Sequence, residues 1–487
     1  MNDASGRTVI PIVPADDAGA QLVSLYASQQ KIYPRAVSGW FAGWRWALVW
    51  ATQLLFYGIP WLQWNARQAV LFDLASRRFY IFGLVLYPQD FIYLTGLLIL
   101  SAYALFLFTA VAGRLWCGYA CPQTVYTEIF MWVEQKFEGD RIARMKLDAG
   151  PWTTQKWLRK GGKQFAWISI GLWTGFTFVG YFTPVRTLWQ EAFTLGFGPW
   201  EWFWVNFYGF ATYGNAGFMR EQVCKYMCPY ARFQSAMFDK DTLVIGYDPA
   251  RGEPRGSRPR RVEHAALAEL GKGDCIDCGL CVQVCPTGID IRDGLQYECI
   301  GCAACIDVCD GVMDKMNYPQ GLIRYATENG IAKQWSRSQM LRRVVRPRVL
   351  IYSAVWLAIA LAFVTTLALR KPFKVDVVRD RGTLARLVED GRIENVYRLQ
   401  LMNASETAQR FRVRVDGLPG AVISSRSEVD VGATESRWVP VSVQIPPDSA
   451  RDLGPGAHPL RFRIERIDAA LPEGVAVQEK STFVVPK

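Results

Sequence analysis

The sequence contains two cysteine runs of equal spacing, Cys275-Ile-Asp-Cys278-Gly-Leu-Cys281-Val-Gln-Val-Cys285-Pro286 and Cys299-Ile-Gly-Cys302-Ala-Ala-Cys305-Ile-Asp-Val-Cys309. In such runs, three thiolates separated by two residues bind one iron–sulfur cubane and the fourth cysteine binds the other. The runs therefore predict two [4Fe–4S] clusters. Cluster 1 would be held by Cys275, Cys278, Cys281 and Cys309, and cluster 2 by Cys299, Cys302, Cys305 and Cys285.

The same spacing fits a zinc site poorly, because structural zinc sites use two cysteine pairs joined by a longer spacer. One position departs from the usual pattern, since Asp310 stands where the second run normally ends in proline. All eight cysteine ligands are present. The departure therefore concerns the local turn and the cluster potential, and we still expect both clusters.

The composition of the whole chain is typical of a membrane protein. Hydrophobic residues make up 51% and aromatic residues 14%, with 19 Trp, and the net charge is +11. Trp and Tyr gather at membrane interfaces, and Lys and Arg gather in cytoplasmic loops. Nucleic-acid binding would also explain positive charge, but the sequence shows no recognisable nucleic-acid-binding module. We therefore expect membrane lipid, and no nucleic acid, as a partner.

All 12 cysteines lie between Cys117 and Cys309. Disulfide frameworks belong mainly to small exported domains, so metal or redox chemistry of thiolates is the better interpretation. The only histidines are His264 and His458, which excludes a bis-His haem and a His-rich copper or zinc site. We interpret both histidines as surface residues.

Five apolar runs have about the length needed to cross 30 Å of hydrocarbon. They are Trp44–Trp64, Phe91–Ala112, Phe165–Phe182, Pro199–Phe218 and Val349–Leu369. Lys and Arg are concentrated after the second and fourth runs, so the positive-inside rule predicts a cytoplasmic N-terminus and an external C-terminus. Residues 1–38 show no signal-peptide pattern. The Arg/Pro-rich stretch 251–261 is interpreted as a solvated tether in preference to an anion site.

The chain after Phe373 changes to a strand pattern. Residues 411–415 and 441–445 alternate apolar and polar side chains with a period of two, and Gly and Pro clusters separate such segments. Several short strands at this spacing predict an antiparallel, immunoglobulin-like β-sandwich of about 110 residues.

Two further cysteine pairs share one motif: Cys117-Gly-Tyr-Ala-Cys121-Pro122 and Cys224-Lys-Tyr-Met-Cys228-Pro229. Each pair follows an even-numbered apolar run, so both should lie at the cytoplasmic interface. Because proline favours the first turn of a helix, Cys121 and Cys228 are expected to cap new helices, where a thiol has a lowered pKa. Four inert buried cysteines would be the alternative, but the repeated spacing argues against it.

Soft thiolates favour Cu(I) or an iron–sulfur cluster. Nearby methionines could assist in binding Cu(I), although methionine in a membrane helix more commonly serves packing. From these residues alone, the four cysteines could bind copper, bind a further cluster or act as redox thiols.

The whole arrangement resembles the FixG/RdxA/CcoG family, accessory proteins for assembly of cbb3-type cytochrome c oxidase. Further similar stretches are Tyr33-Pro-Arg35, Phe79-Tyr-Ile-Phe82 and Pro88-Gln-Asp90. The resemblance implies a multi-pass protein of the bacterial inner membrane, with a cytoplasmic ferredoxin domain and a periplasmic C-terminal domain. It also implies reduction of Cu(II) to Cu(I), with the oxidase or its copper-delivery proteins as partners.

The resulting hypothesis is a cupric reductase in which a cytoplasmic electron donor, not identified by the sequence, reduces the two clusters. The electrons would then reach copper held by Cys117, Cys121, Cys224 and Cys228. A quinol dehydrogenase subunit of a respiratory chain is the main alternative, and a non-redox assembly scaffold is a third.

The expected organisation has seven parts. They are a cytoplasmic N-terminal segment (1–38), a four-span membrane unit with both Cys-x-x-x-Cys-Pro motifs (39–240), a basic tether (241–262), a dicluster ferredoxin domain (263–330), a basic juxtamembrane segment (331–348), a fifth transmembrane helix (349–369) and an exported immunoglobulin-like β-sandwich (373–487).

Overall fold

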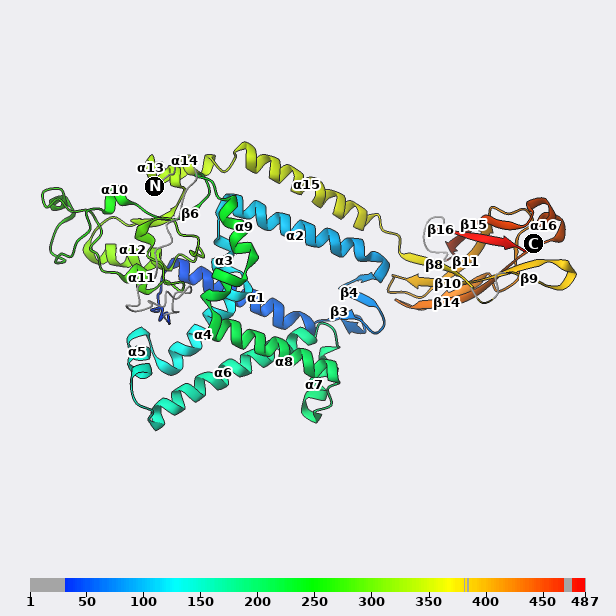
Figure 1. The fold of residues 1–487 in the computed structure, drawn as a ribbon, viewed down its shortest axis with the longest axis horizontal. Helices are drawn as coiled ribbons and strands as arrows, with labels where there is room; N and C mark the ends of the chain where they lie inside the picture. The colour runs from blue at the N-terminus through cyan, green and yellow to red at the C-terminus, as the bar shows by residue number, and fades with distance from the viewer. Residues whose placement is uncertain (1–30, 381, 383–384, 468–474, 487) are drawn as a thin grey trace, which may run out of the picture.

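The computed structural model describes residues 31–380, 382, 385–467 and 475–486. Of the N-terminal segment expected over residues 1–38, only the part from Lys31 onward lies within the described residues. A ferredoxin domain and a β-sandwich lie at opposite ends of a group of long helices (Figure 1).

The long helices correspond to the five apolar runs. They are α1 (Trp40–Gly58), α2 (Phe91–Ala112), α6 (Thr154–Val179), α8 (Pro199–Gly214) and α15 (Pro347–Ala368). Two helical segments, Pro88–Ala112 and Pro347–Ala368, are long and apolar enough to cross a membrane by length and composition. The five-span bundle expected from the sequence thus has two such helices in the described part of the chain. The other three are shorter or include polar residues.

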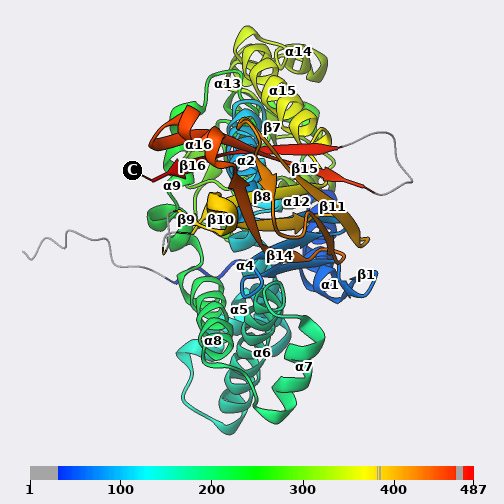
Figure 2. The same cartoon turned by 90° about the vertical axis from the view of Figure 1, so that its right-hand side faces the viewer.

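The long helices pack in two pairs, α2 with α15 and α6 with α8. Viewed from the sandwich end, α2 and α15 lie on one side, and α6 and α8 on the other (Figure 2). Gly175 permits the close approach of α6 and α8, because a Cβ there would lie 2.1 Å from the Val205 carbonyl oxygen. Small residues commonly allow such close packing of helices.

Shorter helices connect these pairs at the ferredoxin end. They are α3 (Leu115–Tyr119), α4 (Pro122–Glu138), α5 (Arg141–Ala149), α9 (Pro229–Met237) and two π-helical turns, Asn215–Met219 and Val223–Met227; α7 (Val185–Thr194) lies at the other end. A small antiparallel sheet of β3 (Val70–Asp73), β4 (Arg78–Ile81) and β5 (Leu84–Leu86) interrupts the expected four-span unit. Its Leu71 and Tyr80 pack with Met402 of the sandwich, so this sheet joins the helices to the C-terminal domain.

The C-terminal domain is the expected sandwich of two antiparallel sheets. One sheet has the order β12–β14–β10–β8, with β9 paired to β10, and the other has the order β13–β11–β15–β16. The strands are β8 (Phe373–Arg379), β9 (Arg386–Leu387), β10 (Ile393–Asn403), β11 (Gln409–Asp416), β12 (Val422–Ile423), β13 (Glu428–Val431), β14 (Ser436–Ile445), β15 (Gly456–Arg466) and β16 (Ala476–Val485). Alternate residues of these strands, such as Phe411 and Val413, fill the core, as the period-two pattern predicts.

The ferredoxin domain contains α11 (Leu280–Gln283), α12 (Ala304–Met316), β6 (Val244–Tyr247) and β7 (Ile323–Ala326). The antiparallel pairing of β6 with β7 joins the expected tether, 241–262, to this domain. Arg251 and Arg258 also fold back onto the domain, Arg251 pairing with the Asp274 carboxylate and Arg258 donating to the Asp274 carbonyl at 2.8 Å. The segment is therefore part of the ferredoxin fold, and its interpretation as a solvated tether is wrong. The physical reason is that burial of the apolar strand Val244–Tyr247 in the domain has a lower free energy than its exposure to solvent.

Candidate functional site

Each cysteine run of the ferredoxin domain begins as a loop and continues into a helix, the short α11 in the first run and the longer α12 in the second. Gly279 and Ala303 precede α11 and α12, and both have the left-handed backbone conformation, with φ of 63° and 60°. This conformation costs glycine little but strains alanine. The turn directs the chain back on itself, so that successive cysteines of one run line a common centre.

The structure places the four cysteines of each predicted set around one cavity. Cys275, Cys278, Cys281 and Cys309 line the first cavity, and Cys285, Cys299, Cys302 and Cys305 line the second. Cys281 borders both cavities, which places the two centres next to each other. Four thiols around one apolar cavity are the donor set of a [4Fe–4S] cubane, so the residues present fit this group.

The two Cys-x-x-x-Cys-Pro pairs, far apart in sequence, also come together. Cys117 lies in α3, Cys224 lies in the second π-helical turn, and Cys121 and Cys228 are the N-caps of α4 and α9. We refer to these four residues as the cysteine quartet. Every thiol of the quartet interacts electrostatically with the other three.

Burial changes the acidity of Cys117, Cys121 and Cys224. Burial raises the pKa of Cys117 to about 11 and that of Cys224 to about 12. Burial also raises the pKa of Cys121, although backbone N–H groups at the start of α4 act in the opposite direction. The expected lowering of this pKa at a helix N-terminus is therefore wrong for Cys121, because desolvation outweighs the helix end.

Among the described residues, no three His, Cys, Asp or Glu side chains converge closely enough to hold a single metal ion. This holds for the quartet and for both ferredoxin sets alike. The quartet cysteines thus surround a common region without meeting at one point. Gln234, a buried residue of α9, donates from Nε2 to the Cys117 sulfur at 3.5 Å.

The quartet and cluster 2 are in direct backbone contact. Gly118 follows the first quartet cysteine, and a Cβ at Gly118 would lie 2.8 Å from both the Cα and the amide nitrogen of Cys302. Opposite it, a Cβ at Gly301 would lie 3.1 Å from the carbonyl group of Arg114. The loop of cluster 2 therefore packs directly against the segment that positions Cys117.

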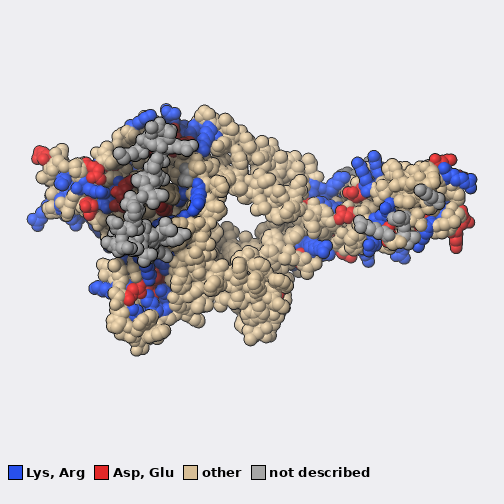
Figure 3. Space-filling model, viewed as in Figure 1, with Lys and Arg blue, Asp and Glu red and all other residues tan. Residues whose placement is uncertain are grey.

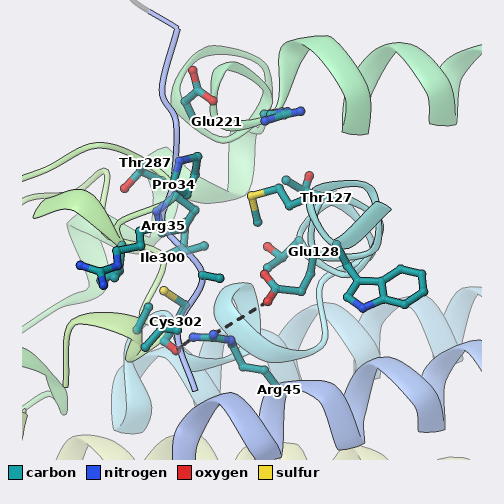
Figure 4. Close-up of a pocket in the computed structure, with 18 of the residues that line it drawn as sticks. Pro34, Arg35, Arg45, Thr127, Glu128, Glu221, Thr287, Ile300 and Cys302 are labelled. Carbon is teal, nitrogen blue, oxygen red and sulfur yellow. Dashed lines mark hydrogen bonds and ion pairs between the residues drawn. The ribbon is translucent and has the colours of Figure 1, made fainter. Parts of the chain in front are cut away.

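A cavity opens between the same two sites (Figure 4). Cys224 and Cys302 both line this cavity, together with Glu128 and residues of the N-terminal segment. Arg45 extends into it from α1, donating from Nη1 to the Cys302 carbonyl oxygen at 2.6 Å and lying 3.8 Å from the Glu128 carboxylate (Figure 4). Arg45 thereby connects α1, α4 and the loop of cluster 2.

A buried ion network anchors the quartet segment. Glu134 of α4 pairs with Arg144 at 2.8 Å and with Arg220 at 3.0 Å, while Lys163 pairs with Glu138 at 2.8 Å. Arg220 stands between the two π-helical turns, four residues before Cys224. The network thus connects the second cysteine pair to the helix that follows the first.

Sequence reasoning missed Arg45, Arg114, Gly118 and Gln234. Arg45 lies inside an apolar run and Arg114 directly after one, and both are buried, with 5% and 6% exposure. A charged residue at such a position is a signal that could have identified both arginines. Gly118 and Gln234 had no comparable signal, because their roles depend on contacts between distant segments.

Three family models match this chain. A model described as a 4Fe-4S dicluster domain matches residues 219–328, and one described as a 4Fe-4S binding domain matches residues 94–139. A model described as an IG-like fold at the C-terminal of FixG matches residues 363–486.

Three relatives match most of the chain. It is 38% identical over 457 residues to the nitrogen fixation protein FixG of Rhizobium meliloti, covering 86% of this chain and 87% of FixG. It is 39% identical over 461 residues to protein RdxA of Cereibacter sphaeroides, and the match covers 92% of this chain and 96% of RdxA. It is 42% identical over 403 residues to protein RdxB of the same organism, and the match covers 81% of this chain and 84% of RdxB.

Among solved structures, a FixG-related protein from Vibrio parahaemolyticus matches with 23% identity and a TM-score of 0.20, covering 24% of this chain and 97% of that one. Nothing further follows from a TM-score this low. The three relatives and the two iron–sulfur models lead to the same conclusion. The chain belongs to the FixG/RdxA family, and it is an iron–sulfur electron-transfer protein with two [4Fe–4S] clusters.

Proposed function

We propose that this protein is a membrane-bound cupric reductase that supplies Cu(I) during assembly of a cbb3-type cytochrome c oxidase. The observation that supports this most is the contact between the loop of cluster 2 and the quartet segment, at Gly118 and Cys302. Electrons that reach cluster 2 are then next to four soft thiols. Soft sulfur ligands stabilise Cu(I) over Cu(II), which favours reduction of copper bound there.

The reaction balances with one electron and needs no proton. The clusters that the two ferredoxin cysteine sets would hold would each supply one electron at a time, so that one Cu(II) is reduced to Cu(I) for each cluster oxidised. Cys117, Cys121, Cys224 and Cys228 would supply the thiolates for the ion, and the quartet would have to draw closer together than in this structure to do so. A one-electron carrier of the cytoplasm would reduce the clusters again, and the oxidase or its copper-delivery proteins would receive the Cu(I).

A location in the inner membrane is part of this proposal. A band of uncharged surface separates the charged ferredoxin end from the charged sandwich end (Figure 3). Large apolar side chains of the long helices are exposed, including Ile92, Phe210 and Leu361 at 73%, 74% and 65%. Exposed apolar surface of this extent is expected where lipid covers it. We therefore propose five spans, with the ferredoxin domain in the cytoplasm and the sandwich in the periplasm.

One observation favours a second candidate for the quartet. The 4Fe-4S binding-domain model matches residues 94–139, which include Cys117 and Cys121, and these two thiols could complete a cluster with Cys224 and Cys228. The quartet would then hold a third [4Fe–4S] cluster and pass electrons onward without binding copper itself.

Metal analysis after anaerobic purification distinguishes these possibilities. The copper proposal expects about eight iron per chain, whereas a third cluster would give about twelve. After addition of one equivalent of Cu(I), the copper proposal further expects stoichiometric copper that is lost in Cys117→Ala and Cys224→Ala. Tyr226→Ala, at an exposed position between Cys224 and Cys228, is the matched control and should retain copper.

Activity is measured with the same proteins. Reduction of Cu(II) by dithionite-reduced protein should be abolished in Cys117→Ala, Cys121→Ala, Cys224→Ala and Cys228→Ala, while the cluster spectra remain. Wild-type rates in all four variants would overturn the assignment of copper to the quartet. Oxidation of quinol analogues by the wild-type protein, in the absence of copper reduction, would instead identify a quinol dehydrogenase, and failure of both reactions would favour a scaffold.

A further inference from the structure

Arg114 is a buried cation that has no carboxylate partner among the residues that the structure describes. Its side chain is 6% exposed, and Nη2 donates to the Ala231 carbonyl oxygen at 2.6 Å. Its Nε is buried without a hydrogen-bond acceptor. Within the described part of the chain, Arg114 forms no ion pair with any Asp or Glu.

An uncompensated charge at this depth is strongly unfavourable, because desolvation of an ion costs several kcal/mol. A guanidinium does not lose its proton in a protein, so it cannot avoid this cost by becoming neutral. A neighbouring anion must therefore balance the charge of Arg114.

The groups that can supply this negative charge are thiolates bound to iron. Arg114 and Cys299 line the same small cavity, and Arg114 acts electrostatically on both Cys299 and Cys117. A [4Fe–4S] centre with four thiolates has a net negative charge, and reduction makes it more negative. Arg114 therefore stabilises the reduced form of cluster 2 more than the oxidised form.

Two other arginines near the clusters, the buried Arg45 and the partly buried Arg292, are neutralised by carboxylates. Arg45, which donates to the Cys302 carbonyl oxygen, lies 3.8 Å from Glu128. Arg292 borders the cavity of cluster 1 and pairs with both Asp290, at 2.6 Å, and Asp277, at 2.5 Å. Cluster 2 thus has an unpaired cation beside it, whereas the cation beside cluster 1 is already paired twice.

We propose that Arg114 is a positioning residue for electron flow, which raises the reduction potential of cluster 2 above that of cluster 1 and so directs electrons from cluster 1 through cluster 2 to the quartet. With both clusters bound, one electron would pass from reduced cluster 1 to oxidised cluster 2 without transfer of a proton, and Arg114 would act on this step through its charge alone. The direction toward the quartet rests on the proposed function, whereas the effect on cluster 2 depends only on the two clusters.

The test is a redox titration of the full-length protein with dithionite, followed by electron paramagnetic resonance, without copper. Arg114→Gln should lower the ratio of reduced to oxidised cluster 2 about tenfold at a fixed potential, which is about 59 mV for a one-electron couple. Cluster 1 should be unchanged. Arg114→Lys should retain the wild-type potential, and Arg261→Gln, which removes an exposed arginine of the ferredoxin domain, should have no effect.

A second variant covers the case in which Arg114→Gln loses iron. Gln296 lines the same cavity as Arg114 and Cys299, so Gln296→Glu adds a carboxylate of nearly equal size to the wall of that cavity. This change should also lower the potential of cluster 2. The proposal is overturned if cluster 2 has the wild-type potential in Arg114→Gln protein that retains its iron. If Arg114→Gln loses iron, a wild-type potential of cluster 2 in Gln296→Glu overturns it. An equal shift of the potential in Arg261→Gln also overturns it. Because copper is absent, these results are independent of the cupric reductase proposal.

Discussion

Gly118 allows the closest backbone approach between the quartet segment and the loop of cluster 2. A methyl group there would clash with the backbone of Cys302, a predicted ligand of cluster 2. We expect Gly118→Ala to destabilise the protein by about 1–3 kcal/mol, as overpacking does. It should also slow electron transfer from cluster 2 in stopped-flow measurements. Gly161→Ala is the control, because a Cβ at Gly161 meets no atom within 4 Å, and it should be neutral or stabilising.

Glu134 is the residue that holds the buried ion network together. Burial alone would raise its pKa, but Arg220, Arg144 and Lys163 outweigh burial and lower the pKa below the ordinary value of 4.5. Its charge therefore stabilises the fold above pH 4.5, and this contribution is lost as the pH falls through the lowered value.

Glu134→Gln should accordingly cost about 3–5 kcal/mol at pH 7, because it leaves buried cations unpaired. Its stability should also depend less on pH below 4.5 than that of the wild type, as measured by chemical denaturation. Glu328→Gln removes an exposed partner of Lys240 and should cost less than about 1 kcal/mol. Equal losses in the two variants would contradict the role assigned to Glu134.

At the scale of elements, β6 completes the ferredoxin domain from outside the cysteine runs. Ile245 of β6 is 3% exposed and lines the cavity of cluster 2. Ile245→Ala should cost about 2–5 kcal/mol and admit water and oxygen to this cluster. Loss of cluster absorbance in air should therefore be faster than in the wild type. Leu270→Ala, at a 55% exposed position of the same domain, should decay at the wild-type rate.

At the scale of the whole molecule, the two charged ends separated by an apolar band predict a topology. A reporter that is active only in the periplasm should be active when fused after Lys487 and inactive when inserted near Gly271. The Lys and Arg residues of the loops after the second and fourth apolar runs provide the physical reason. An active reporter near Gly271 would place the ferredoxin domain outside and reverse the proposed electron path.

The sequence by itself determined the local features of this protein. Cysteine spacing predicts the two ligand sets because each run needs only a short loop around one centre, and Cys-Pro steps predict the helix starts at Pro122 and Pro229. Period-two patterns predict strands such as β11 and β14 because one face of each must be buried. Each of these features depends on neighbouring residues alone.

Only the tertiary structure decided which distant segments meet. The quartet forms because α3, α4, α9 and a π-helical turn converge, and no local pattern specifies that convergence. The unpaired state of Arg114 and the addition of β6 to the ferredoxin sheet were decided in the same way. The physical reason is that burial and charge balance are properties of the packed chain, in which the environment of a side chain is made mainly by residues far away in sequence.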